Sequence, residues 1–454
     1  MLRALFAALI FGLFPGPAAQ AQETVSLSSE ALLAAGEQAL AAGDTATAAQ
    51  IAESFLAQMP GAPRAILLSG YAALRAGDTD TALARARTLW RSDAPREARR
   101  AAAELAAEAH LTRRNFGAAR RWLARAARLA PPGRARDTLR SAAARAKEAA
   151  STTFTFSLSI APSSNVNGGA DSPFITAEGV PFVGTLSESA QALPGTVADL
   201  SFSARHRLSQ SSAHRLIVGA ALFARHVWLS EDARERAPDL SNSDLSYRRL
   251  DAFVQREMRL GAQSELRLSA GPGFVWQAEE ARDALLNVDA RLTTRFDAGL
   301  LRLGFRLEEA FAQDDTADQR RLDLSASWRL PLAGGRFTAG ARVGETQTAS
   351  DLERSDRRTL RAGWQRPLEG LPLTVSLDAA RTFTTYPDYT LLGIPVTGGR
   401  RDIRTVLRAQ AALGVENPWG LVPVLSFTAE ETTSNVSRFD TDELGLGLSI
   451  RRSF

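Results

Sequence analysis

Apolar and polar residues alternate along most of the chain after residue 150. In residues 301–307, every second residue is leucine or phenylalanine, and arginine or glycine stands between them. Successive side chains of a strand point to opposite faces, so this period of two predicts strands with one apolar and one polar face. Fourteen such segments can be counted, beginning near Phe154, Val197, Arg215, Arg249, Glu265, Val288, Leu301, Leu322, Arg336, Leu360, Leu373, Ile403, Leu421 and Leu444.

The connections between these segments alternate between short and long. Short turns are expected around Gln210, Gln263, Gly299, Gly334, Glu369 and Pro418, and longer loops over residues 163–196, 229–246, 279–286, 312–319, 347–357, 386–400 and 433–441. This rhythm is typical of outer-membrane barrels. A soluble β-sandwich would also alternate, but it has no reason to gather every long loop at one end. The sequence therefore predicts an antiparallel transmembrane β-barrel of about 14 strands over residues 151–454.

An even number of strands places both ends of a barrel on the same side of the membrane. We expect that side to be the periplasm, with the long loops outside the cell. The last strand, from Gly445 to Phe454, should close the barrel against the first, because closure leaves no unpaired edge in lipid. The terminal Phe454 resembles the signal for barrel assembly, so the assembly machinery and outer-membrane lipid are expected partners.

Arginines occur on the polar face of many predicted strands, opposite leucine and phenylalanine. In a barrel with lipid outside and water inside, these arginines should face the lumen. The predicted lumen-facing set is Arg291, Arg295, Arg302, Arg306, Arg321, Arg329, Arg336, Arg342, Arg404 and Arg408. Carboxylates on the same segments could neutralise some of them, namely Asp289, Asp297, Glu308 and Asp323.

Before residue 151 the chain is rich in alanine and arginine, and a repeat is present. Three pairs of positions lie 34 residues apart, and these are Gly36 and Gly70, Gly43 and Gly77, and Ala48 and Ala82. The pattern resembles tetratricopeptide repeats, in which small residues let paired helices approach closely. A third copy, residues 114–131, lacks the small residue and the Gly-Asp turn. The sequence predicts a helical solenoid over residues 23–150, whose concave face would bind protein.

Residues 1–21 have the features of a secretory signal peptide. A short basic start precedes an apolar run from Ala4 to Phe14 and the triplet Ala19-Gln20-Ala21. The apolar run is too short to cross a bilayer, and no run of 18 apolar residues follows it. The 454 residues include no cysteine, which excludes disulfides and a thiol nucleophile. We therefore expect the repeats in the periplasm and the barrel in the outer membrane.

As a whole, the chain resembles the surface lipoprotein assembly modifiers (Slam), which combine a periplasmic tetratricopeptide domain with an outer-membrane barrel. The resemblance rests on three pieces, "APSSNVNGG" at residues 161–169, "GGRRD" at residues 398–402 and the C-terminal segment from Gly420. It implies that the chain delivers particular lipoproteins, or related secreted haem- and iron-binding proteins, to the cell surface. The implied translocation residues are Pro162, Ser164, Asn165, Asn167, Arg400, Arg401, Asp402, Pro423, Asn435 and Phe439.

No enzyme, metal or cofactor site is expected. The histidines of the barrel region, His206, His214 and His226, stand beside a predicted turn or rim, and the phosphate-binding, dinucleotide-binding and zinc-protease motifs do not occur. The net charge of +4 is only a weak indication of anionic partners. Nucleic acid is not an expected partner, because the signal peptide would separate the chain from it. A passive pore for anionic solutes or exopolysaccharide, with the repeats as a scaffold, is the alternative function.

Overall fold

The structure is a computed structural model that describes residues 28–313, 316–414 and 421–453. The predicted signal peptide, the expected turn at Pro418 and the assembly residue Phe454 lie outside the described residues. The chain forms two compact units, divided between Lys147 and Glu148. The predicted boundary near Ser151 lies between the last helix of the first part and the first strand of the barrel.

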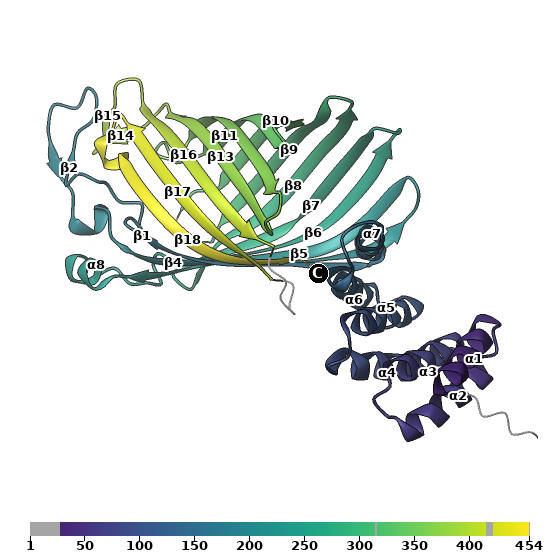
Figure 1. The fold of residues 1–454 in the computed structure, drawn as a ribbon. Helices are drawn as coiled ribbons and strands as arrows, with labels where there is room; N and C mark the ends of the chain where they lie inside the picture. The colour runs from purple at the N-terminus through teal and green to yellow at the C-terminus, as the bar shows by residue number, and fades with distance from the viewer. Residues whose placement is uncertain (1–27, 314–315, 415–420, 454) are drawn as a thin grey trace, which may run out of the picture. The chain divides into compact units, whose positions relative to one another are not determined.

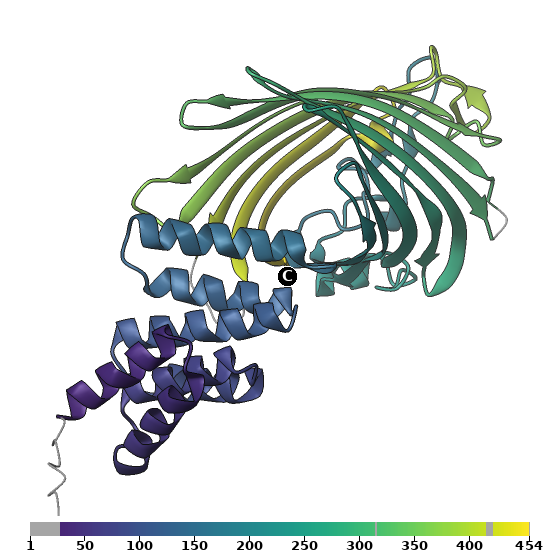
Figure 2. The ribbon, with the colours of Figure 1, turned by 90° about the vertical axis from the view of Figure 1, so that its right-hand side faces the viewer.

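Within the described residues, seven helices precede the first strand, and Figure 2 shows them stacked on one another. They are α1 (Ser29–Ala41), α2 (Thr45–Gln58), α3 (Pro63–Arg75), α4 (Thr79–Arg91), α5 (Arg96–Thr112), α6 (Phe116–Leu129) and α7 (Arg134–Ala149). In the part of the chain that is described, no helix is long and apolar enough to cross a membrane.

The repeated Gly-Asp pairs form the turns between paired helices. Gly43 and Gly77 have φ values of 86° and 89°, which only glycine adopts without strain. The aspartates that follow them cap the next helix, because the Asp44 and Asp78 carboxylates accept hydrogen bonds from backbone N–H groups of its first turn. Each pair thus ends one helix and begins the next.

Small residues lie where the helices touch. A Cβ atom at Gly36 would lie 2.6 Å from Leu68 Cδ2, and one at Gly70 would lie 2.5 Å from Leu105 Cδ2. Ala48 and Ala82 are fully buried. The glycines of α1 and α3 therefore hold the leucines of the next unit, as the repeat pattern predicts.

The third copy keeps the turn and the small residue in altered form, contrary to expectation. Asn115 caps α6 as Asp78 caps α4, and Arg114 takes the left-handed conformation with φ 54°. Arg114 follows Ala107 by seven positions, as Gly77 follows Gly70, and Ala107 is buried. The small residue and the turn of this unit were not predicted, because α5 has 17 residues where α3 has 13, which breaks the period of 34.

Fourteen strands of the described residues form a closed antiparallel barrel, so the predicted solenoid followed by a barrel is confirmed (Figure 1). They are β1 (Thr152–Ser163), β4 (Gly195–Gln210), β5 (His214–Leu229), β6 (Tyr247–Leu260), β7 (Ser264–Gln277), β8 (Glu280–Phe296), β9 (Gly299–Ala312), β10 (Gln319–Leu332), β11 (Gly335–Thr348), β12 (Ser355–Leu368), β13 (Leu373–Tyr386), β16 (Arg400–Leu413), β17 (Val422–Ser434) and β18 (Thr441–Ser453).

The terminal strand closes the barrel against the first, as expected. β18 pairs with β1 in a register that sets Leu448 opposite Ile160 and Ser453 opposite Thr155. Leucines of β18 such as Leu444 and Leu446 are more than half exposed, whereas Ser449 is buried. The alternation therefore separates an outward apolar face from an inward polar face, which is the arrangement that a barrel in lipid requires.

One predicted loop is wrong. Residues 280–286 belong to β8, and β7 and β8 are joined by a two-residue turn, Ala278 and Glu279. Both turn residues have positive φ, 49° and 69°, as in the type I′ hairpin turn that favours Asn-Gly or Gly-Gly. The turn was missed because its residues carry no turn signal in the sequence.

Candidate functional site

Three loops at the long-loop end of the barrel fold together with the strand ends beside them, and we call residues 164–194, 386–402 and 435–440 the loop cap. They contain the short elements β2 (Phe174–Ile175), β3 (Gly184–Thr185), η1 (Glu188–Ala190), β14 (Thr390–Leu391), β15 (Ile394–Pro395) and η2 (Ser437–Phe439). Figure 1 shows β2, β14 and β15 beside one another at this end. The buried core of the loop cap consists of Ile175, Tyr389, Leu391, Val396 and Val436.

Hydrogen bonds of the backbone and of the Ser437 hydroxyl tie the first loop to the other two. Thr176 and Ser437 exchange hydrogen bonds of 2.8 and 2.9 Å. The Thr397 N–H donates to the Glu178 carbonyl at 3.0 Å. Residues that lie more than 200 positions apart in the sequence are thus held as one packed structure.

The asparagines of "APSSNVNGG" fold the start of the first loop. The buried Asn165 amide donates to the Gly169 carbonyl and accepts from the Gly169 N–H, both at 2.8 Å. The Asn167 side chain donates to the Ser189 and Gln191 carbonyls at 2.9 and 2.8 Å. Gly169 must be glycine here, because a Cβ atom would lie 2.2 Å from the Gln191 carbonyl oxygen.

Arg400 is the charged centre of the loop cap. Its guanidinium carbon lies 3.3 Å from the ring centre of Phe439 and 3.9 Å from that of Tyr386. The same group binds the Asp402 carboxylate with contacts of 2.6 to 3.1 Å, and both residues are 9% exposed. Such a pair between aromatic rings is stabilising only while both charges are present.

Arg401 and Asn435 join the loops on the outer side of this centre. The Arg401 N–H donates to the Asn435 side chain at 2.7 Å, and the Asn435 amide donates to the Gly399 carbonyl at 2.9 Å. The Arg401 guanidinium pairs with Glu178 across the loops at 2.5 Å, with both side chains half exposed. Five predicted translocation residues therefore meet in one place, and these are Arg400, Arg401, Asp402, Asn435 and Phe439.

Two aspartates of the same end are partly desolvated. Burial raises the pKa of Asp440, and the nearby charge of Asp402 adds to this rise. Burial also raises the pKa of Asp171, with the charges of Asp442 and Asp440 as further causes. These carboxyl groups therefore take up protons at a higher pH than an isolated aspartate does.

The other predicted translocation residues lie elsewhere or make fewer contacts. Pro162 and Ser164 are exposed at the long-loop end of β1. Pro423 lies at the other end of the barrel, where it pairs in register with Ile450. The sequence did not point to Tyr386, Tyr389 or Glu178, because single aromatic and acidic residues far from a motif carry no signal of their own.

Nine of the ten predicted lumen arginines line hollows on the inner side of the barrel, the exception being Arg321. Arg321 lies 3.1 Å from the buried Glu308, which also binds Arg249 at 2.9 Å. Arg404 pairs with Glu430 and Arg306 with Asp289. The arginines Arg205, Arg267 and Arg361, which were not predicted, also line a hollow, although the alternation around each of them predicts an inward side chain.

The barrel histidines lie in separate places. His206 contacts the Thr152 hydroxyl at 2.8 Å, and His214 contacts the Ser211 hydroxyl at 2.9 Å. His226 packs edge-on against Trp228, with ring centres 4.4 Å apart. In the residues that the structure describes, no group of three or more His, Asp or Glu could hold a metal ion.

Comparison with known families gives a match in the C-terminal part of the chain. Residues 309–454 match the family described as surface lipoprotein assembly modifier. This is the family that the sequence resembles, so the resemblance is confirmed over these residues. The match and the outer-membrane type of barrel support an outer-membrane location and a role in surface lipoprotein assembly. A search of curated proteins found no match.

Similar solved structures are outer-membrane proteins. A loop-deletion mutant of OmpT from Vibrio cholerae is 8% identical, with 67% of this chain and 100% of that chain covered and a TM-score of 0.37. OprB from Pseudomonas putida is 9% identical, with 67% and 94% covered and a TM-score of 0.38. An outer-membrane channel from Pseudomonas putida F1 is 12% identical, with 67% and 96% covered and a TM-score of 0.37.

Proposed function

We propose that this chain translocates specific lipoproteins, or related secreted haem- and iron-binding proteins, across the outer membrane to the cell surface. The observation that carries the proposal is the family match over residues 309–454. The matched segment supplies Arg400, Asp402, Asn435 and Phe439 to the loop cap, so these four residues belong to one packed structure. The protein acts as a conduit and binding surface, without a catalytic group or cofactor of its own.

The proposal has the helical repeats in the periplasm, where they meet the client first. Both ends of the barrel chain lie on its short-turn side, which supports a helical domain on that side of the membrane. Because the chain has no cysteine, single cysteines report its orientation directly. An impermeant thiol reagent applied to intact cells should label S172C and spare S92C, and the reverse labelling would contradict this orientation.

The test of function is display of a client. The chain is expressed with the secreted protein encoded beside it, and surface exposure of that protein is measured by protease shaving. A chain lacking residues 23–150 keeps every barrel strand, so it should insert yet display the client poorly. Antibiotic uptake serves as the control for leakage and should change little.

The arginines of the lumen favour a second candidate, a passive pore for anionic solutes or exopolysaccharide with the repeats as a scaffold. The same experiment separates the two functions. If client display is unchanged when the whole protein is removed, while uptake of anionic solutes falls, the translocation proposal is wrong and the pore is supported.

A further inference from the structure

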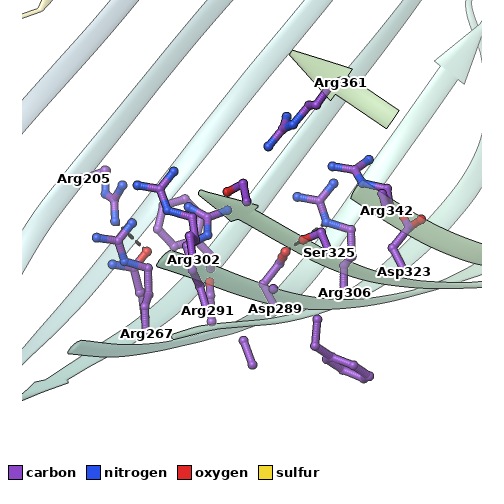
Figure 3. Close-up of a pocket in the computed structure, with 17 residues that line it drawn as sticks. Arg205, Arg267, Asp289, Arg291, Arg302, Arg306, Asp323, Ser325, Arg342 and Arg361 are labelled. Atoms are coloured by element: carbon purple, nitrogen blue, oxygen red, sulfur yellow. Dashed lines mark hydrogen bonds and ion pairs between the residues drawn. The ribbon is translucent and has the colours of Figure 1, made fainter. Parts of the chain in front are cut away.

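A cavity of about 470 Å³ opens on the inner side of the barrel, lined by residues of β4 and of β6 to β12. Figure 3 shows its arginines directed into one hollow, with Arg361 reaching it from a strand remote from those of Arg267 and Arg291. The translocation motifs contribute none of its lining residues.

Positive charge exceeds negative charge in this cavity. Two of its arginines have ion pairs, Arg306 with Asp289 and Arg267 with Glu257, both at 2.9 Å. Asp323 is the remaining carboxylate of the lining. Among the described residues, five further lining arginines make no ion pair, and these are Arg205, Arg291, Arg302, Arg342 and Arg361.

The strand register brings some of these charges together. Arg267 on β7 lies directly opposite Arg291 on β8, an arrangement of like charges that destabilises a sheet when nothing stands between them. Arg302 on β9 is opposite Thr293, which places it diagonal to Arg291 on the same face. In the described part of the chain, the buried Nε atoms of Arg267 and Arg302 have no hydrogen-bond acceptor.

Small and hydroxylated residues leave the space between the arginines open. Gly304 faces Arg291 on one side and Ser325 on the other, and Ser325 faces Arg342. Ser327 lies opposite Arg302. A larger residue at these positions would fill the cavity, and the serine hydroxyls add donors to a site that already has many guanidinium N–H groups.

We propose that this cavity binds a small multivalent oxyanion of the phosphate type. The lining offers many donors and few acceptors, which is the complement of a phosphate group, and arginine binds phosphate through two parallel hydrogen bonds. Unpaired charge inside a membrane protein is costly, so an anion between Arg267, Arg291 and Arg302 would relieve their repulsion. The site does not depend on the proposed translocation function.

The test measures binding of pyrophosphate to the full chain in detergent by titration calorimetry, in a phosphate-free buffer at low and raised salt. R291Q and R302Q should each weaken binding by about tenfold or more, because each removes charge-assisted hydrogen bonds. S327F fills the cavity without changing its charge and should abolish binding. R358Q is the matched control, since Arg358 lies on β12 like Arg361 but on the outer face, opposite the exposed Val343 and Phe383.

Folding of each variant is checked by its heat-modifiable migration, so that loss of binding is not confused with loss of the barrel. Binding that is retained in R358Q, weakened in the two inner variants and absent in S327F supports the site. Wild-type protein that does not bind pyrophosphate overturns the proposal, and so does binding that S327F leaves unchanged. Tighter binding of an acidic peptide than of pyrophosphate would overturn the assignment to phosphate.

Discussion

The helical unit and the barrel use the same apolar residues in opposite ways. In the helices, Leu89, Leu105 and Ala82 are completely buried. In the barrel wall, Leu360 and Leu377 are 58% and 55% exposed, while arginines and carboxylates face the inside. The difference follows from the solvent of each unit, because water drives apolar groups inward and lipid accepts them on the outer surface.

The two units consequently depend on different interactions. The helices pack through glycine and alanine at close contacts, so their stability depends on the shape of the core. The barrel closes through a ladder of backbone hydrogen bonds between β1 and β18, so single outer side chains matter less to its closure. Substitutions that test shape should therefore act more strongly in the helices than in the barrel wall.

The loop cap follows neither the pattern of the helices nor that of the barrel wall. A substitution in it should have the largest effect on stability. The loop cap buries an ion pair inside an aromatic core, and D402N would leave the Arg400 charge buried without its partner. Opening of the loop cap should become easier by about 3–5 kcal/mol. The rate of limited proteolysis within residues 164–194 measures this opening. E178Q removes the exposed partner of Arg401 and should change the cleavage rate little; equal rates in D402N and E178Q would contradict this account.

A matched pair of leucine truncations tests the comparison directly. Leu105→Ala leaves a cavity in the helical core and should lower the free energy of unfolding by about 2–5 kcal/mol. Leu360→Ala lies on the lipid face, where a lipid chain can occupy the vacated space, and should cost no more than about 2 kcal/mol. Denaturant unfolding of the full chain, followed separately for helix and strand signals, measures both; a larger loss at Leu360 would reverse the comparison.

The sequence predicted the strands well because the period of two repeats along every segment. The same alternation predicted inward-facing arginines, because successive residues of a strand point to opposite faces, and nine of the ten line hollows of the barrel. The hairpin at Ala278 and Glu279 was missed because the tertiary pairing of β7 and β8 imposes positive φ on residues that do not favour it. Likewise the lengthened α5 places Ala107 and Arg114 outside the period of 34, so the small residue and the turn of the third repeat could not be predicted.

The loop cap could be predicted only as separate motifs. The pieces around Asn165, Arg400 and Asn435 were identified from the resemblance, but nothing in their spacing shows that Arg401 touches Asn435 or that the loop beginning near Asn165 packs on both. Their meeting depends on barrel closure, which brings the first loop beside the last two. Pro423 shows the converse, because it belongs to the same C-terminal segment yet lies at the opposite end of its strand.

Two glycines allow the same comparison of the helical unit and the barrel with a single added methyl group. A Cβ atom at Gly70 would lie 2.5 Å from Leu105 Cδ2 and 3.3 Å from Arg85 Cβ, whereas one at Gly445 in β18 would have nothing within 4 Å. Gly70→Ala should therefore overpack the helical unit by about 1–3 kcal/mol, and Gly445→Ala should leave the barrel unchanged. Thermal unfolding of each unit checks this, and a stabilised Gly70→Ala helical unit would show that Leu105 can move aside.

The smallest effect concerns the pH dependence of the helical unit. Hydrogen bonds from the Thr47 side chain and backbone lower the pKa of Asp44, and those from the Thr81 side chain and backbone lower the pKa of Asp78. A lowered folded-state pKa contributes stability above the unfolded value of about 3.9, and this contribution is lost as the pH falls through the folded value. The melting temperature of the helical unit should therefore fall slightly in that acid pH range.

The double variant D44N/D78N is the control for this effect, because asparagine caps a helix about as well as aspartate but does not titrate there. It should melt close to the wild type at neutral pH and lose part of the acid shift. The barrel signal of the same samples should keep the same pH profile in both proteins, since these caps belong to the helical unit alone. An acid shift of the same size in the double variant would assign the pH dependence to groups other than the two repeated aspartates.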